Sequence, residues 1–194
     1  CMGKAFVMFQ LGKKPLEEGM NILGAHIDSP RIDVKQNPLY EDSDMAYLDT
    51  HYYGGIKKYQ WVTIPLAIHG TIAKKDGTVQ DIIIGEKEDD PVLVISDLLI
   101  HLSQQQIEKK RSFLREYQLR LQNLHPLTGN DELEKEEKEL VKAAVVQFLK
   151  EKLDMEEEDF LSAELEIVPA GKARDCGLDR SMVIGYGQDD RVCA

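Results

Sequence analysis

Cysteine and positive charge are both scarce in this chain of 194 residues. Its 3 cysteines are too few, and odd in number, for a disulfide framework, and the chain has no Asn-x-Ser/Thr sequon. Both absences favour a reducing compartment, so we expect a cytoplasmic protein. The 24 Lys and Arg residues are outnumbered by 35 Asp and Glu residues, which gives a net charge of −11. That charge disfavours nucleic acid and anionic membrane surfaces as partners.

Long apolar runs are also absent. The best stretch, Val92–Leu102, is interrupted by Asp97 and is shorter than the roughly 18 residues that a membrane-spanning helix needs. Hydrophobic residues make up 42% of the chain and charged residues 30%, which is typical of a globular domain. The first residue is Cys1 rather than Met, and an apolar segment begins at Val192. We therefore expect a piece of a longer protein that does not span a membrane.

Short apolar runs of strand length dominate the first half of the chain. Ala5–Leu11 and Asn21–Ile27 each predict a strand, the second largely buried, and Ile32–Lys35 predicts a third extended segment. Gly24 lies inside the second run, where a missing side chain suggests close approach of another backbone.

The strongest β signal lies between residues 46 and 86. Trp61–Lys75 and Thr78–Ile84 are strand-like runs joined by Asp76-Gly77. A two-residue Asp-Gly link predicts a hairpin with a type I′ turn, in which both central residues have positive φ. Pro65 cannot donate to a ladder, so it favours an edge or a bulge for the first of these strands.

The second half of the chain predicts helix and then strand. Asp131–Leu153 has the apolar spacing of an amphipathic helix, with Thr128 or Asn130 as its N-cap, and Leu161–Val168 alternates like a strand. The basic cluster Lys109–Arg111 is typical of a solvated face, although a nucleic-acid contact is the alternative. Strands followed by one long helix and a further strand indicate a mixed α/β fold.

Several catalytic signatures are missing: a P-loop, Gly-x-Ser-x-Gly, His-Glu-x-x-His and Cys-x-x-Cys. His26 and Asp28 form a His-x-Asp motif at the end of an apolar run. A carboxylate that accepts one ring N–H fixes the histidine tautomer and leaves the other nitrogen for a metal. Asp189 and Asp190 follow two glycines, where they could bind a metal or cap a helix. Taken alone, each motif favours the simpler explanation, which is a structural pair for His26 and Asp28 and a helix cap for Asp189 and Asp190.

Taken together, four segments resemble bacterial members of the aspartyl aminopeptidase (aminopeptidase I) family of zinc metallopeptidases. The resemblance covers nearly the whole chain in the same order and is weakest over Ser103–Lys152. The four segments that carry it are GAHIDSPRIDVKQNPL, THYYGGIKKYQW, IPLAIHG and GLDRSMVIGYGQDDRVCA.

The resemblance implies roles for particular residues of this chain. It makes His26 a metal ligand and Asp28 the residue that orients it. It makes Asp190 the ligand that bridges two metal ions, with Asp189 as the alternative. It also implies that His69 contacts substrate in the active site of a neighbouring subunit. The cofactors implied are two divalent metal ions, with zinc expected and manganese or cobalt as alternatives.

The resemblance further implies a domain plan. Residues 1–35 and 176–194 would belong to a dizinc-exopeptidase-like α/β catalytic domain. Residues 36–175 would form an inserted β-rich dimerisation domain with one long helix. Family members act on peptides and assemble from dimers into tetrahedral dodecamers, so we expect self-association as well as peptide substrates.

One departure from the family pattern is large. The family site also needs a Glu-Glu pair, which supplies a general base and a ligand, and a later Asp and His. The Glu-Glu runs at 136–137 and 156–158 belong to the predicted helix and an acidic turn, and only four residues follow Asp190. We therefore expect a metalloaminopeptidase in the full-length protein and an inactive isolated chain. The alternative is a non-catalytic module for self-assembly.

Overall fold

The computed structural model describes residues 5–43, 45–97, 99–102, 118–120, 139–187 and 192, with residues 118–120 described by their backbone alone. None of the helices in these residues combines the length and the apolar character required to cross a bilayer. The predicted Lys109–Arg111 cluster and the aspartates at 189 and 190 lie outside the described residues.

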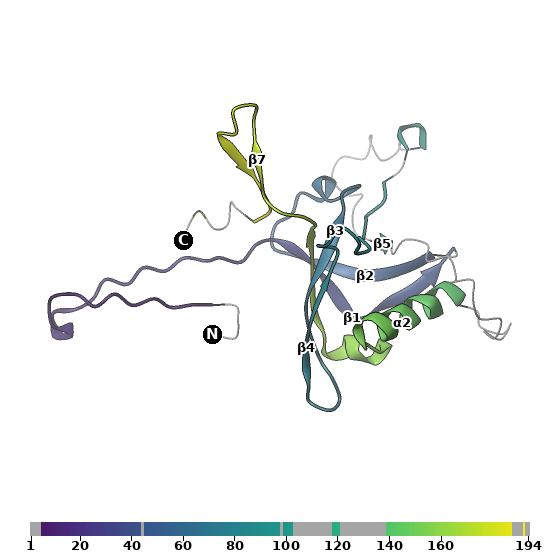
Figure 1. The fold of residues 1–194 in the computed structure, drawn as a ribbon, viewed down its shortest axis with the longest axis horizontal. Coiled ribbons are helices and arrows are strands. Elements are labelled where there is room, and N and C mark those ends of the chain that lie inside the picture. The colour runs from purple at the N-terminus through teal and green to yellow at the C-terminus, as the bar shows by residue number, and fades with distance from the viewer. Residues whose placement is uncertain are drawn as a thin grey trace.

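A six-stranded sheet forms the centre of the structure, with the strand order β4-β3-β6-β1-β2-β5. All of its neighbouring strands are antiparallel. Beyond it, the described residues form a two-stranded hairpin, one α-helix and four short 3₁₀ helices (Figure 1). The prediction of a mixed α/β fold is confirmed. The strands are β1 (Arg31–Asp42), β2 (Met45–Tyr53), β3 (Leu66–Ala73), β4 (Val79–Ile84), β5 (Gln118–Arg120), β6 (Glu164–Pro169), β7 (Arg174–Cys176) and β8 (Met182–Ile184). The helices are η1 (Leu16–Glu18), η2 (Lys58–Gln60), η3 (Ile100–Leu102), α2 (Leu140–Leu153) and η4 (Glu157–Ser162).

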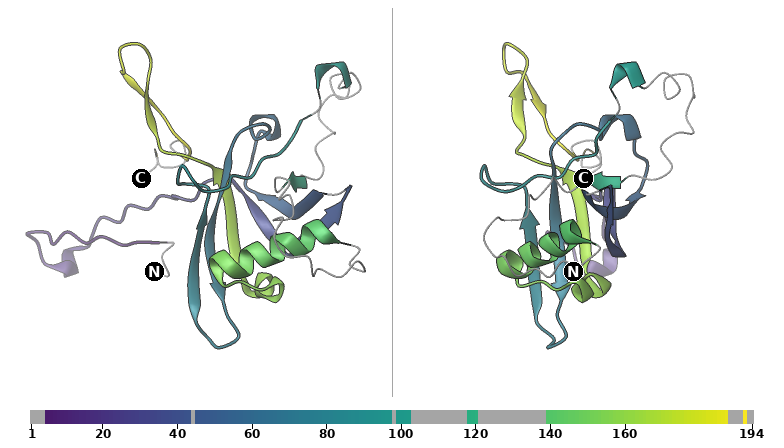
Figure 2. Two further views of the ribbon diagram at one scale, coloured as in Figure 1. Left: turned by 45° about the vertical axis from the view of Figure 1, so that its right-hand side comes forward. Right: turned by 90° about the vertical axis from the view of Figure 1, so that its right-hand side faces the viewer.

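The two faces of the sheet differ in polarity because side chains alternate along each strand. Ile32, Ile167 and Ile68 are opposite one another on β1, β6 and β3, and all three are buried. Helix α2 lies against this apolar face (Figures 1 and 2) and contributes Val145 to the core. The next residue of β1 and β3 and the preceding residue of β6 form a polar row on the other face, which consists of Asp33, His69 and Glu166.

An apolar cavity of about 150 Å³ lies between α2 and the sheet. Val145 and Phe148 border it from the helix, and Ile82 and Ile84 border it from β4. The core beneath α2 is therefore not completely filled.

The predicted hairpin is present, but its turn differs from the expected type I′. The Gly77 N–H donates to the Lys74 carbonyl at 2.9 Å, and the Lys74 N–H donates to the Thr78 carbonyl at 2.8 Å. Gly77 has positive φ, whereas Asp76 does not. Asp76 instead accepts hydrogen bonds from the backbone N–H and the hydroxyl of Thr78. This is a longer turn with a left-handed glycine, which is the next common way to close a hairpin.

The sequence suggested an edge or a bulge for the strand that contains Pro65, but the strand is not at an edge. Strand β3 begins at Leu66, directly after the proline, and lies between β4 and β6. The Pro65 carbonyl accepts a hydrogen bond of 3.0 Å from the Ala170 N–H. A proline before the first ladder residue costs the sheet no hydrogen bond, which explains why the strand can be internal.

The strands predicted at Ala5–Leu11 and Asn21–Ile27 are wrong. Residues 5–30 form no strand and extend away from the sheet (Figure 1). Phe9 is 87% exposed and Leu23 is 97% exposed, and nothing among the described residues lies within 4 Å of a Cβ built on Gly24. A strand needs a hydrogen-bonded partner strand, and within the described part of the chain neither segment belongs to a sheet.

The second half of the chain follows the predicted order. Helix α2 ends at Leu153 as predicted, and its C-cap Asp154 has left-handed geometry with φ of 50°. The helix begins at Leu140, and the candidate caps at 128 and 130 lie outside the described residues. The predicted strand Leu161–Val168 corresponds to β6, although η4 contains Leu161.

Candidate metal centre

The His-x-Asp motif forms the side-chain pair that the sequence predicts. His26 Nδ1 lies 3.1 Å from Asp28 Oδ1, and both side chains are exposed. An ionised carboxylate can only accept, so the hydrogen must be on Nδ1. The lone pair of His26 Nε2 is then directed away from the pair and can bind a metal ion.

Tyr53, at the end of β2, binds the other oxygen of the same carboxylate. Its hydroxyl donates to Asp28 Oδ2 at 2.9 Å. The hydrogen bond from Tyr53, followed by the one from His26, holds the pKa of Asp28 below its usual value. The hydrogen bond between Tyr53 and Asp28 also raises the pKa of Tyr53. The carboxylate of Asp28 is therefore held between two hydrogen-bond donors, His26 and Tyr53.

Arg31, the first residue of β1, lies over the ring of Tyr53 with its guanidinium carbon 4.1 Å from the ring centroid. Its Nε donates to Asp33 Oδ1 at 2.8 Å and lies 3.1 Å from Glu166 Oε1. Partial burial lowers the pKa of Arg31, but the attraction of Glu166 and Asp33 outweighs that effect and raises it overall. Arg31 therefore links β1, β6 and the tyrosine by charge and by a cation–π contact.

Tyr186 contacts the segment that follows the His-x-Asp motif. Its hydroxyl donates to the Pro30 carbonyl, and its ring meets Trp61 edge-on with the centroids 6.0 Å apart. The turn at 186–187 therefore lies beside the segment that carries His26 and Asp28. The adjacent Asp189 and Asp190 lie outside the described residues, so their position relative to His26 stays a prediction.

His69 lies on β3, opposite Glu166 of β6 and Ile83 of β4. Its Nε2 is 2.8 Å from Glu86 Oε1, and the other oxygen of Glu86 accepts from the Gly171 N–H at 3.4 Å. Within this chain the histidine is therefore tied to the loop after β4, on the polar face of the sheet.

Sequence reasoning did not assign roles to Tyr53 and Arg31. Tyr53 is one of two tyrosines before a Gly-Gly turn and could equally line a pocket or an interface. The signal available for Arg31 was its alternation with Asp33, which puts both on one face of a strand. The contact of Tyr53 with Asp28 and that of Arg31 with Tyr53 depend on how β1 and β2 pair, which the sequence does not specify.

The donor set fits one ligand of a zinc site. An imidazole whose second nitrogen is bound to a carboxylate is the usual form of a zinc-binding histidine. Across the described ranges no cluster of three or more His, Cys, Asp and Glu side chains could hold a metal ion. The described residues therefore provide His26 and its supporting contacts rather than a complete coordination shell.

Comparison with protein families gives one match that covers the chain. The model described as "Aminopeptidase I zinc metalloprotease (M18)" matches residues 1–194. A probable M18 family aminopeptidase 1 of Clostridium acetobutylicum is 62% identical over 193 residues, which is 99% of this chain and 41% of that protein. Its counterpart in Thermotoga maritima is 48% identical over 192 residues, again 99% of this chain and 41% of that protein. The chain thus spans about 41% of the length of these relatives.

Solved structures agree with the sequence relatives. The crystal structure of aminopeptidase I from C. acetobutylicum has a TM-score of 0.83 at 62% identity, over 94% of this chain and 40% of that chain. Aminopeptidase I from Borrelia burgdorferi B31 has a TM-score of 0.76 at 43% identity, over 94% of this chain and 40% of that chain. The S. cerevisiae mApe1 dodecamer, at 15% identity and a TM-score of 0.50 over 83% of this chain and 33% of that chain, shares the fold. The chain belongs to the M18 family of aminopeptidase I zinc metalloproteases.

Proposed function

We propose that this chain is part of a zinc metalloaminopeptidase that hydrolyses the N-terminal residue of peptides in the cytoplasm. Family membership supports the reaction class. The observation that supports a role for this part of the protein is the 3.1 Å contact between His26 Nδ1 and Asp28 Oδ1. That contact prepares Nε2 of His26 as a metal ligand.

The proposed site assigns a task to each predicted residue. His26 binds one metal ion through Nε2, and Asp28 holds the imidazole in the required tautomer and orientation. Asp190, with Asp189 as the alternative, is the proposed bridge between two metal ions. Zinc is the expected metal, with manganese and cobalt as alternatives, and the bound metal supplies a Lewis acid for the peptide carbonyl.

We also propose that residues 1–35 and 176–194 belong to the catalytic domain and residues 36–175 to an inserted domain. The contact between Tyr186 and Pro30 supports this division, because it joins the two catalytic segments across the sheet that separates them in sequence. Strand β1 starts at Arg31, so the proposed boundary at 35 falls within its length. The exposed apolar side chains of residues 5–24 fit a segment that other parts of a longer protein cover.

The decisive test is the His26→Ala substitution in the full-length protein. We expect at least a hundredfold loss of turnover of an aminoacyl nitroanilide, together with loss of bound zinc, because a ligand is removed. His51→Ala is the matched control, since His51 is an exposed histidine of β2 outside the proposed ligand set. Unchanged turnover and zinc content in His26→Ala would overturn the proposal.

A second candidate function is self-association through the β-rich domain, with dimers that build a tetrahedral dodecamer. Exposed apolar side chains on strand β4, Val79 at 69% and Ile83 at 58%, support an interface on this part of the sheet. Light scattering after size exclusion tests it, and a monomer at micromolar concentration would contradict it.

His69 is proposed to contact substrate bound to a neighbouring subunit. In that case His69→Ala lowers activity, and an added subunit with intact His69 but inactive His26→Ala partly restores it. Absence of rescue would leave His69 with the local contact to Glu86 that the structure shows.

A further inference from the structure

We propose that Tyr53 is a positioning residue for the metal ligand His26, acting through Asp28, and that Arg31 fixes Tyr53 for this task. The inference rests on the proposed function, because it takes His26 as a ligand. It adds two residues to the site that neither the sequence pattern nor the metal chemistry identifies.

The first step concerns the freedom of Asp28. Its carboxylate is exposed, so a single hydrogen bond to His26 would let it rotate about its terminal torsion. Tyr53 binds the second oxygen at 2.9 Å while His26 binds the first at 3.1 Å. Two donors on two different oxygens fix the plane of the carboxylate, and hydrogen bonds to a charged acceptor are the stronger kind.

The second step concerns the freedom of Tyr53. Its ring is held by the Arg31 guanidinium 4.1 Å from its centroid. Arg31 is only 17% exposed at its side chain, and it is bound by Asp33 of β1 and Glu166 of β6. Because both carboxylates belong to the six-stranded sheet, the ring of Tyr53 has a rigid support.

The third step concerns the backbone that joins these groups. Gly54 follows Tyr53 with φ of +72°, and a Cβ built on it would lie 3.4 Å from Pro30. Tyr186 donates to the carbonyl of the same Pro30. Gly54 and Tyr186 thus contact the segment from Asp28 to Arg31. These contacts fix the backbone of Asp28, whose carboxylate accepts the hydrogen bond from the Tyr53 hydroxyl.

These contacts make a continuous path from the sheet to the metal ligand. Glu166 and Asp33 bind Arg31, Arg31 covers Tyr53, Tyr53 binds Asp28, and Asp28 binds His26. Removing the tyrosine hydroxyl breaks the path at one atom and leaves the ring and its contact with Arg31 in place. The expected effect is looser orientation of His26 without loss of the fold.

The test is Tyr53→Phe in the full-length protein, with Tyr52→Phe as the matched control. Tyr52 lies one residue earlier on β2, and its ring contacts Lys58 at 4.8 Å. We expect Tyr53→Phe to weaken zinc binding about tenfold in a chelator competition, as for other groups that orient a ligand. The melting temperature of the zinc-free protein should stay at the wild-type value, and the control should bind zinc like the wild type.

A second variant, Arg31→Lys, tests the support for the ring. It keeps the charge and loses the planar face over Tyr53, so we expect zinc binding weaker than in the wild type but stronger than in Tyr53→Phe. If Tyr53→Phe does not fold, the zinc affinity of Arg31→Lys decides, and a wild-type affinity overturns the inference.

The outcomes separate this inference from the proposed function. Wild-type zinc affinity in Tyr53→Phe, with zinc lost in His26→Ala, would overturn the positioning role and leave the metal ligand standing. Zinc retained in His26→Ala would overturn the proposed function itself. An equal loss of affinity in Tyr52→Phe and Tyr53→Phe would show a general effect of β2 and would also overturn the positioning role.

Discussion

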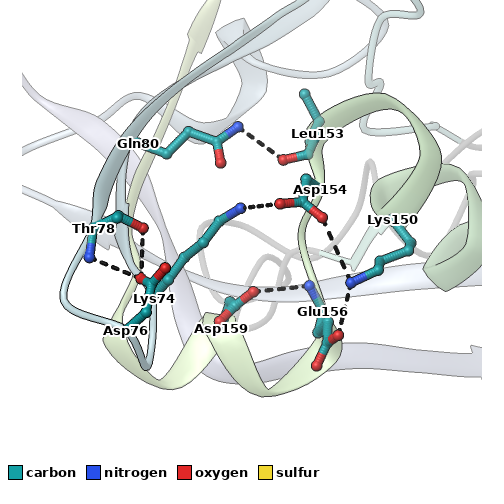
Figure 3. Close-up of polar contacts among 9 residues, drawn as sticks. All are labelled: Lys74, Asp76, Thr78, Gln80, Lys150, Leu153, Asp154, Glu156 and Asp159. Carbon is teal, nitrogen blue, oxygen red and sulfur yellow. Dashed lines mark hydrogen bonds and ion pairs between the residues drawn. The ribbon is translucent and has the colours of Figure 1, made fainter.

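Lys74 and Asp154 form an ion pair across 80 positions of sequence, with 2.6 Å between Nζ and Oδ2 (Figure 3). The pair joins the turn of the β3–β4 hairpin to the end of α2. Lys150 lies 3.5 Å from the other oxygen of Asp154 and 2.7 Å from Glu156. Beside it, the Gln80 amide donates to the Leu153 carbonyl at 2.8 Å. Polar contacts therefore fasten the helix end to the hairpin.

This group of contacts predicts acid sensitivity of the α2 attachment. The hydrogen bond from Lys74 is the largest cause that lowers the pKa of Asp154, and the bond from Lys150 does the same for Glu156. A carboxyl with a lowered folded-state pKa stabilises the fold above its unfolded-state pKa of about 4. That contribution is lost as the pH falls through the folded-state value. Thermal unfolding followed between pH 7 and pH 3 should show a falling midpoint below about pH 4.

Asp154→Asn separates the charge of this residue from its backbone role. Asparagine tolerates the left-handed conformation at the helix end, so only the ion pair is lost. We expect a lower midpoint than the wild type at pH 7 and a smaller difference at pH 3, because the stabilisation that comes from the lowered pKa of the native carboxyl decreases below its unfolded-state pKa of about 4. An equal difference at both values would contradict the electrostatic explanation.

Ile82 and Ile83 are adjacent on β4 and lie in opposite surroundings, with exposures of 1% and 58%. Ile82→Ala removes buried methyl groups and enlarges the space beneath α2, so we expect a loss of about 3 kcal/mol in unfolding free energy. Ile83→Ala should cost less than about 0.5 kcal/mol because its side chain is in solvent. Urea unfolding of the two variants measures the difference in unfolding free energy. Similar losses would contradict the assignment of Ile82 to the core and Ile83 to the surface.

Gly70 allows β3 and β6 to approach closely. A Cβ at this position would lie 1.9 Å from the Glu164 carbonyl oxygen and 2.9 Å from the Leu165 Cα. Gly70→Ala must therefore move one strand, and we expect a loss of about 3 kcal/mol or more. Gly24→Ala is the control, since nothing among the described residues lies within 4 Å of its added Cβ. A Gly70→Ala protein as stable as this control would disprove the close approach.

The cavity beneath α2 predicts a stabilising substitution. Val145 is 3% exposed and borders the cavity of about 150 Å³. Val145→Leu adds a methylene to that space, and we expect a gain of about 0.5–1 kcal/mol in unfolding free energy. Val146→Leu gives the same change in helix propensity at the next position, whose side chain does not border the cavity. If both variants gain equally, the effect comes from propensity and not from filling.

Local patterns predicted the elements whose partners are close in sequence. The β3–β4 hairpin and the end of α2 follow from the Asp-Gly punctuation and from helical spacing. The runs at 5–11 and 21–27 have the composition of strands, but a strand also needs a neighbour that local composition cannot supply. Gly70 was also beyond sequence reasoning, because its importance depends on the position of β6.

The candidate site shows the same division. His26 and Asp28 are two residues apart, so their contact could be predicted from spacing and side-chain chemistry. Tyr53 is 25 residues from Asp28, and its hydrogen bond follows from the pairing of β1 with β2. Glu166 meets Arg31 only because β6 returns beside β1. Tertiary contacts of this kind need the register of strands, which depends on the whole sheet.

The pairing of Ile32 with Ile167 has a consequence for protein engineering. Strand β1 is the first strand of this sheet in the sequence and β6 is the last. The two are paired, and paired antiparallel strands are only about 5 Å apart. The contact between Pro30 and Tyr186 keeps the flanking segments together outside the sheet. A short loop could therefore bridge residues 30 and 170 with little movement of either flank. The sheet is thus an exchangeable unit. Removing it, or replacing it with the equivalent sheet of a relative, would keep the distance between the segment before residue 30 and the segment after residue 170.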